Sequence, residues 1–76
     1  MRIRVCYQLA IEMRKPDIAR DSVKLKRIKN KFRERVGELD ALLNVYHFSI
    51  HDLKKLLKRE EVLDLEVVFY TKNSLH

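Results

Sequence analysis

Apolar residues recur every three or four positions from Ile18 to Leu43, and this spacing constrains the fold of the chain most strongly. At 100° per residue, these side chains fall on one stripe of a helix, which must bury that stripe against another element. Asp17 is a suitable N-cap for this helix. Gly37 is either its C-terminal stop or an internal weak point that costs about 1 kcal/mol relative to alanine. The stripe consists of Ile18, Leu25, Ile28, Phe32, Val36, Leu39 and Leu43.

Two other segments, residues 1–13 and residues 63–71, alternate instead between apolar and polar side chains. A period of two is typical of a strand with one face on the core. Pro16 follows the first segment and ends it, because proline donates no backbone hydrogen bond. We expect the two strands to pair, with Arg2 and Arg4 near Asp64 and Glu66 on the outer face. The core-facing residues are Ile3, Val5, Tyr7, Leu9, Ile11 and Met13 in the first strand and Leu63, Leu65, Val67 and Phe69 in the last.

Residues 43–48, LNVYHF, form a short β-branched and aromatic segment, which favours a strand, with a continuation of the long helix as the alternative. Ser49 and Asp52 then have the spacing of a capping box, and the flanking Phe48 and Leu53 that of a hydrophobic staple, so a second helix is expected from Ser49. The element order is therefore strand, helix, short strand, helix, strand. This order predicts an α/β fold, a small two-layer sandwich with both helices packed on one face of the sheet, in one domain over residues 1–76.

The outer face of that sheet would carry several apolar side chains, and these favour a covering partner. A chain of 76 residues buries only about 60% of the surface that its unfolded form exposes, so independent stability is marginal. Association with a second copy is one remedy for a small domain. We therefore expect a homodimer, on the basis of Cys6, Ala10, Val68 and Tyr70 on the outer face.

The chain contains one cysteine, which cannot form an internal disulfide, and a free thiol is typical of a reducing compartment. No apolar run approaches the roughly 20 residues that a membrane-spanning helix needs. The N-terminal segment mixes charged and apolar residues where a signal peptide would be continuously apolar. We expect a cytoplasmic protein without a membrane span.

The net charge of +6 is concentrated in one part of the sequence. Residues 20–35 contain eight Lys or Arg and two acidic residues, while the other 60 residues contain nine of each sign. A helix with this charge attracts polyanions, and its cations can contact successive phosphates. We expect binding to DNA or RNA with modest sequence specificity, with Arg27, Asn30 and Arg33 able to reach base edges. The predicted phosphate contacts are Arg20, Lys24, Lys26, Arg27, Lys29, Lys31, Arg33 and Arg35.

The same helix is compatible with other roles. It can be a solvated face that keeps the protein soluble, or an interaction module that docks on an acidic protein, where charge steers association. Basic amphipathic helices also lie on anionic membranes. Separately, Tyr70 with Arg2 and Arg4 is either a surface that stacks unpaired bases or part of the dimer interface.

Few residues carry a signal for catalysis or metal binding. His47 and His51 stand four apart, but no Cys or third ligand follows at a defined spacing, so no metal or cofactor is expected. A small metal-independent RNase would need an acid and a base, for which His47, Tyr46, His51 and Arg59 are available. Cys6 has no base partner at a recognisable spacing, although Arg2 and Arg4 could lower its pKa. The pattern favours binding over catalysis.

Overall fold

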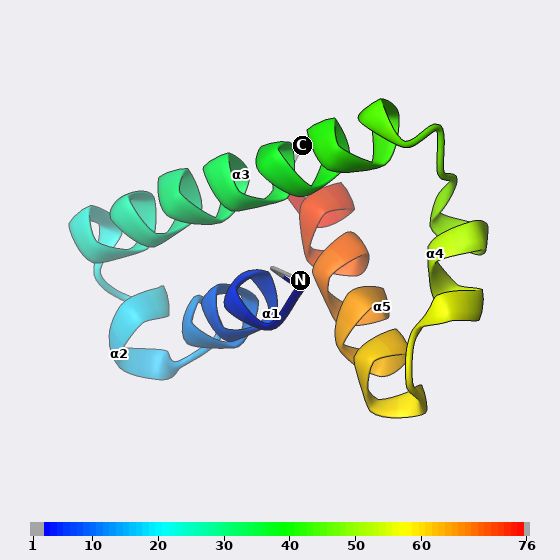
Figure 1. Ribbon diagram of the computed structural model, residues 1–76. Coiled ribbons are helices and arrows are strands. Elements are labelled where there is room, and N and C mark those ends of the chain that lie inside the picture. The colour runs from blue at the N-terminus through cyan, green and yellow to red at the C-terminus, as the bar shows by residue number, and fades with distance from the viewer. Residues whose placement is uncertain (1–2, 76) are drawn as a thin grey trace.

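The computed structural model of the protein describes residues 3–75, and every regular element in that range is a helix (Figure 1). The predicted α/β sandwich is therefore wrong, because no part of residues 3–75 forms a strand. The helices are α1 (Ile3–Glu12), α2 (Pro16–Ala19), α3 (Ser22–Val45), α4 (Ile50–Leu56) and α5 (Arg59–Ser74).

The first helix, α1, replaces the first predicted strand. Its buried side chains are Ile3, Cys6 and Ala10, with Met13 buried just after its end, and this spacing of three or four is helical. Cys6 and Ala10 were assigned to the outer face, yet both are completely buried. Their small side chains let α1 lie close to its neighbours. Conversely, Val5 is exposed although the alternating pattern placed it in the core.

The last helix, α5, replaces the last predicted strand in the same way. It buries Leu65, Val68 and Thr71, whereas Leu63, which was expected in the core, is exposed. The expected contact between Arg4 and Asp64 does form, at 3.2 Å, but it joins two helices. Val68 packs inside the chain with Cys6 and Ala10, so three of the apolar residues that motivated a homodimer are already covered.

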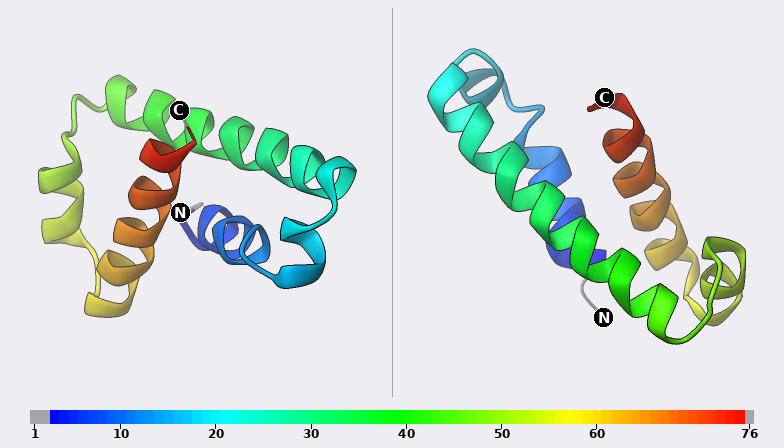
Figure 2. Two further views of the ribbon diagram at one scale, coloured as in Figure 1. Left: turned by 180° about the vertical axis from the view of Figure 1, so that it is seen from behind. Right: turned by 90° about the horizontal axis from the view of Figure 1, so that it is seen from above.

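The long helix α3 runs along one edge of the molecule, with α1, α2 and α5 all on the same side of it (Figure 1; Figure 2). Its inward stripe joins two core clusters. We call these the Phe32 cluster (Cys6, Ala10, Met13, Ile28, Phe32, Val36 and Val68) and the Leu53 cluster (Ile3, Leu39, Leu43, Leu53 and Leu65). The predicted stripe is thus confirmed over α3, with Leu25 and Ile18 partly buried against the Phe32 cluster.

The start of α3 differs from the prediction. Asp17 lies within α2, and the N-cap of α3 is Asp21, whose carboxylate accepts hydrogen bonds from the backbone N–H groups of Val23 and Lys24, both at 3.1 Å. Of the two alternatives for Gly37, the C-terminal stop is wrong and the internal position in the helix is confirmed. Gly37 lies in the middle of α3, and a Cβ placed there would meet nothing within 4 Å.

Residues 43–48 do not form the predicted strand: the helix continues to Val45 and then ends in a tight turn. His47 adopts a left-handed conformation with φ 55°, and the N–H of Phe48 donates to the carbonyl of Leu43 at 2.9 Å. The N–H of His47 donates to the carbonyl of Asn44. This double closure is a Schellman motif, which satisfies carbonyls that a helix end leaves without partners.

The second predicted helix start is confirmed at Ser49. The Ser49 hydroxyl accepts the backbone N–H of Asp52 at 3.1 Å, and the Asp52 carboxylate accepts the backbone N–H of Ser49 at 3.1 Å, which completes a capping box. The Ser49 backbone N–H, and second the Ser49 hydroxyl, which donates to the same carboxylate at 2.9 Å, lower the pKa of the Asp52 carboxyl. The staple residues Phe48 and Leu53 line one apolar hollow together.

None of the helices formed by residues 3–75 is both long enough and apolar enough to cross a membrane.

The contact between α1 and α5 includes a polar link at its edge. Arg14, two residues beyond α1, donates to the hydroxyl of Thr71 at 2.7 Å, and that hydroxyl donates to the carbonyl of Val67 at 2.8 Å. The chain therefore joins its first and last helices by both packing and hydrogen bonds.

Candidate nucleic-acid interface

The cations predicted to contact phosphates all lie on α3 or directly before it, and the helix sorts them into two rows. Because Ile28, Phe32 and Val36 face the core, side chains at other angles around the helix point to its two flanks. The first row, which we call the outer row, consists of Lys24, Arg27 and Lys31 on α3 together with Arg20, which lies before the N-cap Asp21 and outside the register of the helix. The second row consists of Lys26, Lys29 and Arg33. Arg35 follows the outer row one turn further on.

All four side chains of the outer row are exposed. Within residues 3–75, none of them forms an ion pair with an acidic side chain. The nearest acidic residue at the start of the helix, Asp21, is engaged in capping the backbone. Glu34 is exposed and likewise has no ion pair within the described range. The positive charge of the row is therefore left for an external anion to neutralise.

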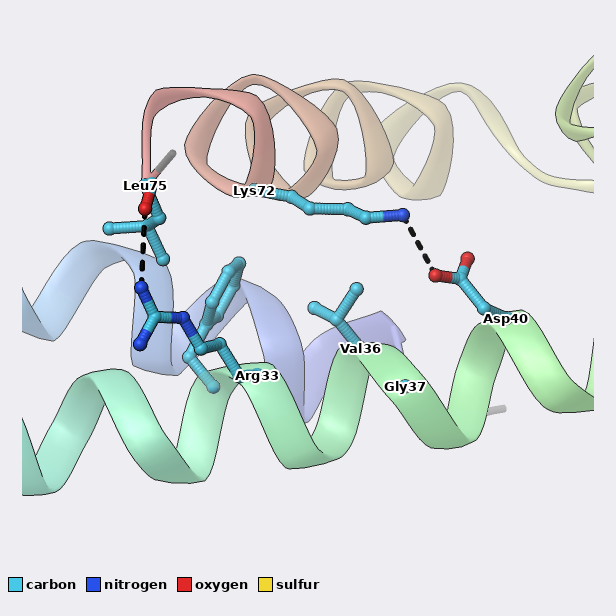
Figure 3. Close-up of a pocket in the computed structure, with 7 residues that line it drawn as sticks. Arg33, Val36, Gly37, Asp40, Lys72 and Leu75 are labelled. Atoms are coloured by element: carbon cyan, nitrogen blue, oxygen red, sulfur yellow. Dashed lines mark hydrogen bonds and ion pairs between the residues drawn. The ribbon is translucent and has the colours of Figure 1, made fainter.

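Two of the eight predicted cations already have partners inside the protein. Arg35 contacts the carboxylate of Glu38 at 3.3 Å, one turn along the helix. Arg33 donates from Nη2 to the carbonyl oxygen of Leu75 at 3.2 Å, at the C-terminal end of α5 (Figure 3). These contacts make Arg33 and Arg35 weaker candidates than the outer row, because a phosphate would have to replace an existing bond. The Arg33 contact could not be predicted from the sequence, since it joins residues 42 apart.

The second row borders a shallow hollow on the surface of α3. Lys26, Lys29 and Arg33 line it together with Ser22, Leu25 and Asn30. Lys29 is partly buried there, whereas Lys26 is exposed. Neither lysine has an acidic partner within the part of the chain that is described. Ammonium groups therefore stand on both sides of the exposed face of α3.

A separate groove lies between α3 and α5 and is closed at both ends by polar contacts (Figure 3). Arg33 and Leu75 form one end, and Lys72 contacts Asp40 at 2.8 Å at the other. Phe32 and Val36 supply an apolar floor. The charged groups around this groove are satisfied within the protein, so the groove does not extend the phosphate surface.

The residues available for RNA cleavage are not brought together. Tyr46 caps the end of α3 and stacks on Phe48 with ring centroids 6.2 Å apart. His47 lies in the tight turn after α3, with a left-handed backbone conformation. His51 lies near the start of α4, and Arg59 is the first residue of α5. The hollow that Tyr46 lines is wholly apolar, and neither histidine borders it. Among residues 3–75 no group of three or more His, Cys, Asp or Glu is arranged to hold a metal ion.

The expectations for Cys6 and Tyr70 change with the fold. Burial raises the pKa of the Cys6 thiol, Glu38 raises it further, and Arg35 opposes this only in part, so the buried thiol is not a reactive thiolate. Tyr70 is exposed on a helix, so the predicted sheet face for stacking bases does not exist. Arg4 is held between Asp64 and the ring of Tyr7, and Arg2 lies outside the described residues.

Comparison with protein families, with curated proteins and with solved structures gives no significant match to this chain. No relative therefore supplies a site or an activity for α3. What the geometry supplies is a group of cations on or directly before a helix that packs against the core on its opposite side. Six of the eight predicted cations have no ion pair or hydrogen-bonded partner within residues 3–75 for their side chains, and they are Arg20, Lys24, Lys26, Arg27, Lys29 and Lys31.

Proposed function

We propose that the protein binds nucleic acid through α3, with the outer row on successive phosphates. The observation that carries this proposal is that the four exposed cations of the row lack acidic partners within residues 3–75. On α3 the row runs from Lys24 to Lys31, seven steps or about 10 Å at 1.5 Å per residue, and Arg20 lies beyond the start of the helix. Because the phosphates of one DNA strand recur about every 3.4 Å along the duplex axis, a row of this length can contact several phosphates at once.

The packing of α3 supports this function as well. Phe32 is completely buried and Ile28 nearly so, which fixes the helix backbone beneath the row. The cations are thus presented in advance, and binding costs mainly the entropy of their own side chains. Contacts with about four to six phosphates would give a slope of about −4 to −5 in a plot of the logarithm of affinity against that of salt concentration.

Two triple variants of equal charge test this function. K24Q/R27Q/K31Q removes three cations of the outer row, and K55Q/K58Q/R59Q removes three exposed cations around the end of α4. Fluorescence anisotropy with labelled DNA and RNA oligonucleotides, from about 0.05 to 0.3 M salt, measures the affinity and its slope. Circular dichroism confirms that both variants remain folded.

We expect the outer-row variant to lose on the order of 10²-fold in affinity at about 0.1 M salt and to flatten the slope by about 3. The control variant should lose far less and keep its slope. Equal losses in the two variants would show that overall charge, and not the row, governs binding. Failure of the unaltered protein to bind any oligonucleotide at low salt would end the proposal.

A further inference from the structure

A third line of residues runs along α3 and points directly away from the core, and it shares Arg27 with the outer row. Its members, at intervals of four, three and four, are Val23, Arg27, Asn30 and Glu34, and we call it the central line. At 100° per residue, the line lies opposite Ile28, Phe32 and Val36. All its side chains are exposed, and Val23 is 67% exposed.

The composition of the central line is that of a surface which reads base edges. Arginine binds guanine O6 and N7 with two hydrogen bonds, asparagine binds adenine N6 and N7, and glutamate accepts from cytosine N4. An apolar side chain such as that of Val23 can contact the thymine methyl group. Arg27 has no ion pair within residues 3–75, so its guanidinium is available for such contacts.

The position of α3 in the molecule gives this line access to a groove. The helices α1, α2 and α5 lie together on the opposite side of α3 and leave its outward face uncovered (Figure 1; Figure 2). An α-helix with side chains is about 10–12 Å across, and the major groove of B-form DNA is about 12 Å wide. The major groove of A-form RNA is deep and narrow and does not admit a helix.

We infer that α3 enters the major groove of double-stranded DNA, with the central line, Arg27 included, on base edges and the other cations of the two rows on the phosphates of opposite strands. This inference rests on the proposed function and adds to it the duplex, the groove and the residues that read sequence. It also replaces Arg33 as a predicted base contact, because Arg33 is bonded to the carbonyl of Leu75. Lys26 and Lys29 provide the phosphate contacts of the second row.

The groove is tested first, with four probes of one base sequence. These are an unmodified DNA duplex, the same duplex carrying glucosylated 5-hydroxymethylcytosine that fills the major groove, the unmodified duplex saturated with netropsin in the minor groove, and the corresponding RNA duplex. We expect the affinity to fall about tenfold or more with the filled major groove and with RNA, and to change little with netropsin. Equal binding to the filled and unfilled duplexes, or to DNA and RNA duplexes, would overturn the inference while leaving phosphate binding intact.

The reading residues are tested by selecting a preferred sequence from randomised duplexes and measuring each variant on that sequence and on a scrambled one. Asn30→Ala should reduce the preference about tenfold at one base pair and leave binding to the scrambled duplex within about twofold, because it removes no charge. Asn44→Ala makes the same change at an exposed position of α3 outside the line and should alter neither affinity.

The Arg27→Lys variant distinguishes recognition of a base from electrostatic attraction to the DNA. Lysine keeps the charge but cannot form the paired hydrogen bonds of a guanidinium. We expect the preference to fall at one guanine while the salt slope stays unchanged. If both variants keep the full preference of the unaltered protein, the central line does not read sequence and the inference fails. If no probe is bound at all, the proposed function fails with it, so the two failures are distinguishable.

Discussion

The two core clusters beneath α3 differ in how completely they are enclosed. In the Phe32 cluster, Cys6, Ala10, Phe32 and Val68 are fully shielded by α1, α3 and α5. The Leu53 cluster also has fully shielded members, but it lies beside a corner where apolar side chains reach solvent. Leu42, Val45 and Leu56 there are 42%, 70% and 68% exposed.

Because of this difference, we expect the basic half of α3 and the α4 corner to differ in local stability. The cations of the outer row stand over the enclosed cluster, so the half of α3 that would meet a nucleic acid is also the half held by three helices. The Leu53 cluster also includes residues of α1, α3 and α5, but α4 itself contributes a single buried side chain, Leu53, and begins with a capping box. Local stability follows the burial of apolar contacts. We therefore expect the corner to open at a lower free energy than the basic half of α3.

The largest effect on the free energy of unfolding is expected from truncating a large buried side chain in either cluster. Phe32→Ala should cost about 3–5 kcal/mol, comparable to the whole stability of a small domain, and should unfold the protein and abolish binding. Leu53→Ala should cost about 2–3 kcal/mol and act mainly on α4. Urea denaturation gives the free energies, and amide hydrogen exchange locates the change. A loss of protection at Ala10 and Met13, which belong to the Phe32 cluster, as large as that in α4 would show that the clusters form one unit.

A smaller effect is expected from the capping box. Ser49→Ala removes the hydroxyl that accepts the Asp52 N–H and should cost about 1 kcal/mol, or about 4–8 °C in Tm. Because the folded structure lowers the pKa of Asp52 below its ordinary 3.8, the carboxylate stabilises the fold above that value. Its contribution disappears as the pH falls through the lowered pKa.

The Asp52→Asn variant tests this pH dependence. It should be less stable than the unaltered protein at neutral pH, and the gap should close in acid. Thermal melts of both proteins across that pH range measure the gap. A gap that stays constant with pH would mean that the Asp52 charge has no part in capping α4.

The smallest effect, and the only stabilising one, is expected at Gly37. Gly37→Ala should raise stability by about 0.5–1 kcal/mol, because glycine weakens a helix interior and the new methyl group meets nothing within 4 Å. Ala41→Gly, the reverse change at an exposed position one turn later, should lower stability by a similar amount. Binding should be unaffected by either. A loss of stability in Gly37→Ala would reveal a close approach at this position.

The sequence predicted α3 well because its apolar residues fit only one period over many turns, and it predicted the start of α4 because a capping box is local chemistry. The sequence-based prediction was wrong at α1 and α5, where the apolar residues fit both the period of a strand and that of a helix. Ile3, Cys6 and Ala10 repeat at helical spacing, but the larger apolar residues of this segment alternate and favour a strand. Which period wins depends on packing between α1 and α5, and no local feature encodes that contact.

The candidate interface was predictable to a similar degree. The placement of all eight cations on one helix, or next to it, followed from spacing. The contact of Arg35 with Glu38, one turn away, was not predicted, although its spacing of three residues is a local signal. The hydrogen bond from Arg33 to the carbonyl of Leu75, which makes Arg33 a weaker candidate, could be found only from the tertiary structure. The outward position of Glu34 could have been found from the wheel, because it lies opposite the buried stripe.

The packing of α1 on α5 has a consequence during synthesis of the chain. Cys6 and Ala10 need Val68 to complete their burial, and Arg14 needs Thr71 as its hydrogen-bond acceptor. At about 5–20 residues per second, a ribosome takes about 2–10 seconds to proceed from the end of α1 to the start of α5. For that interval the emerging chain carries an amphipathic helix without its partner, open to chaperones, and the core can close only after α5 has left the exit tunnel.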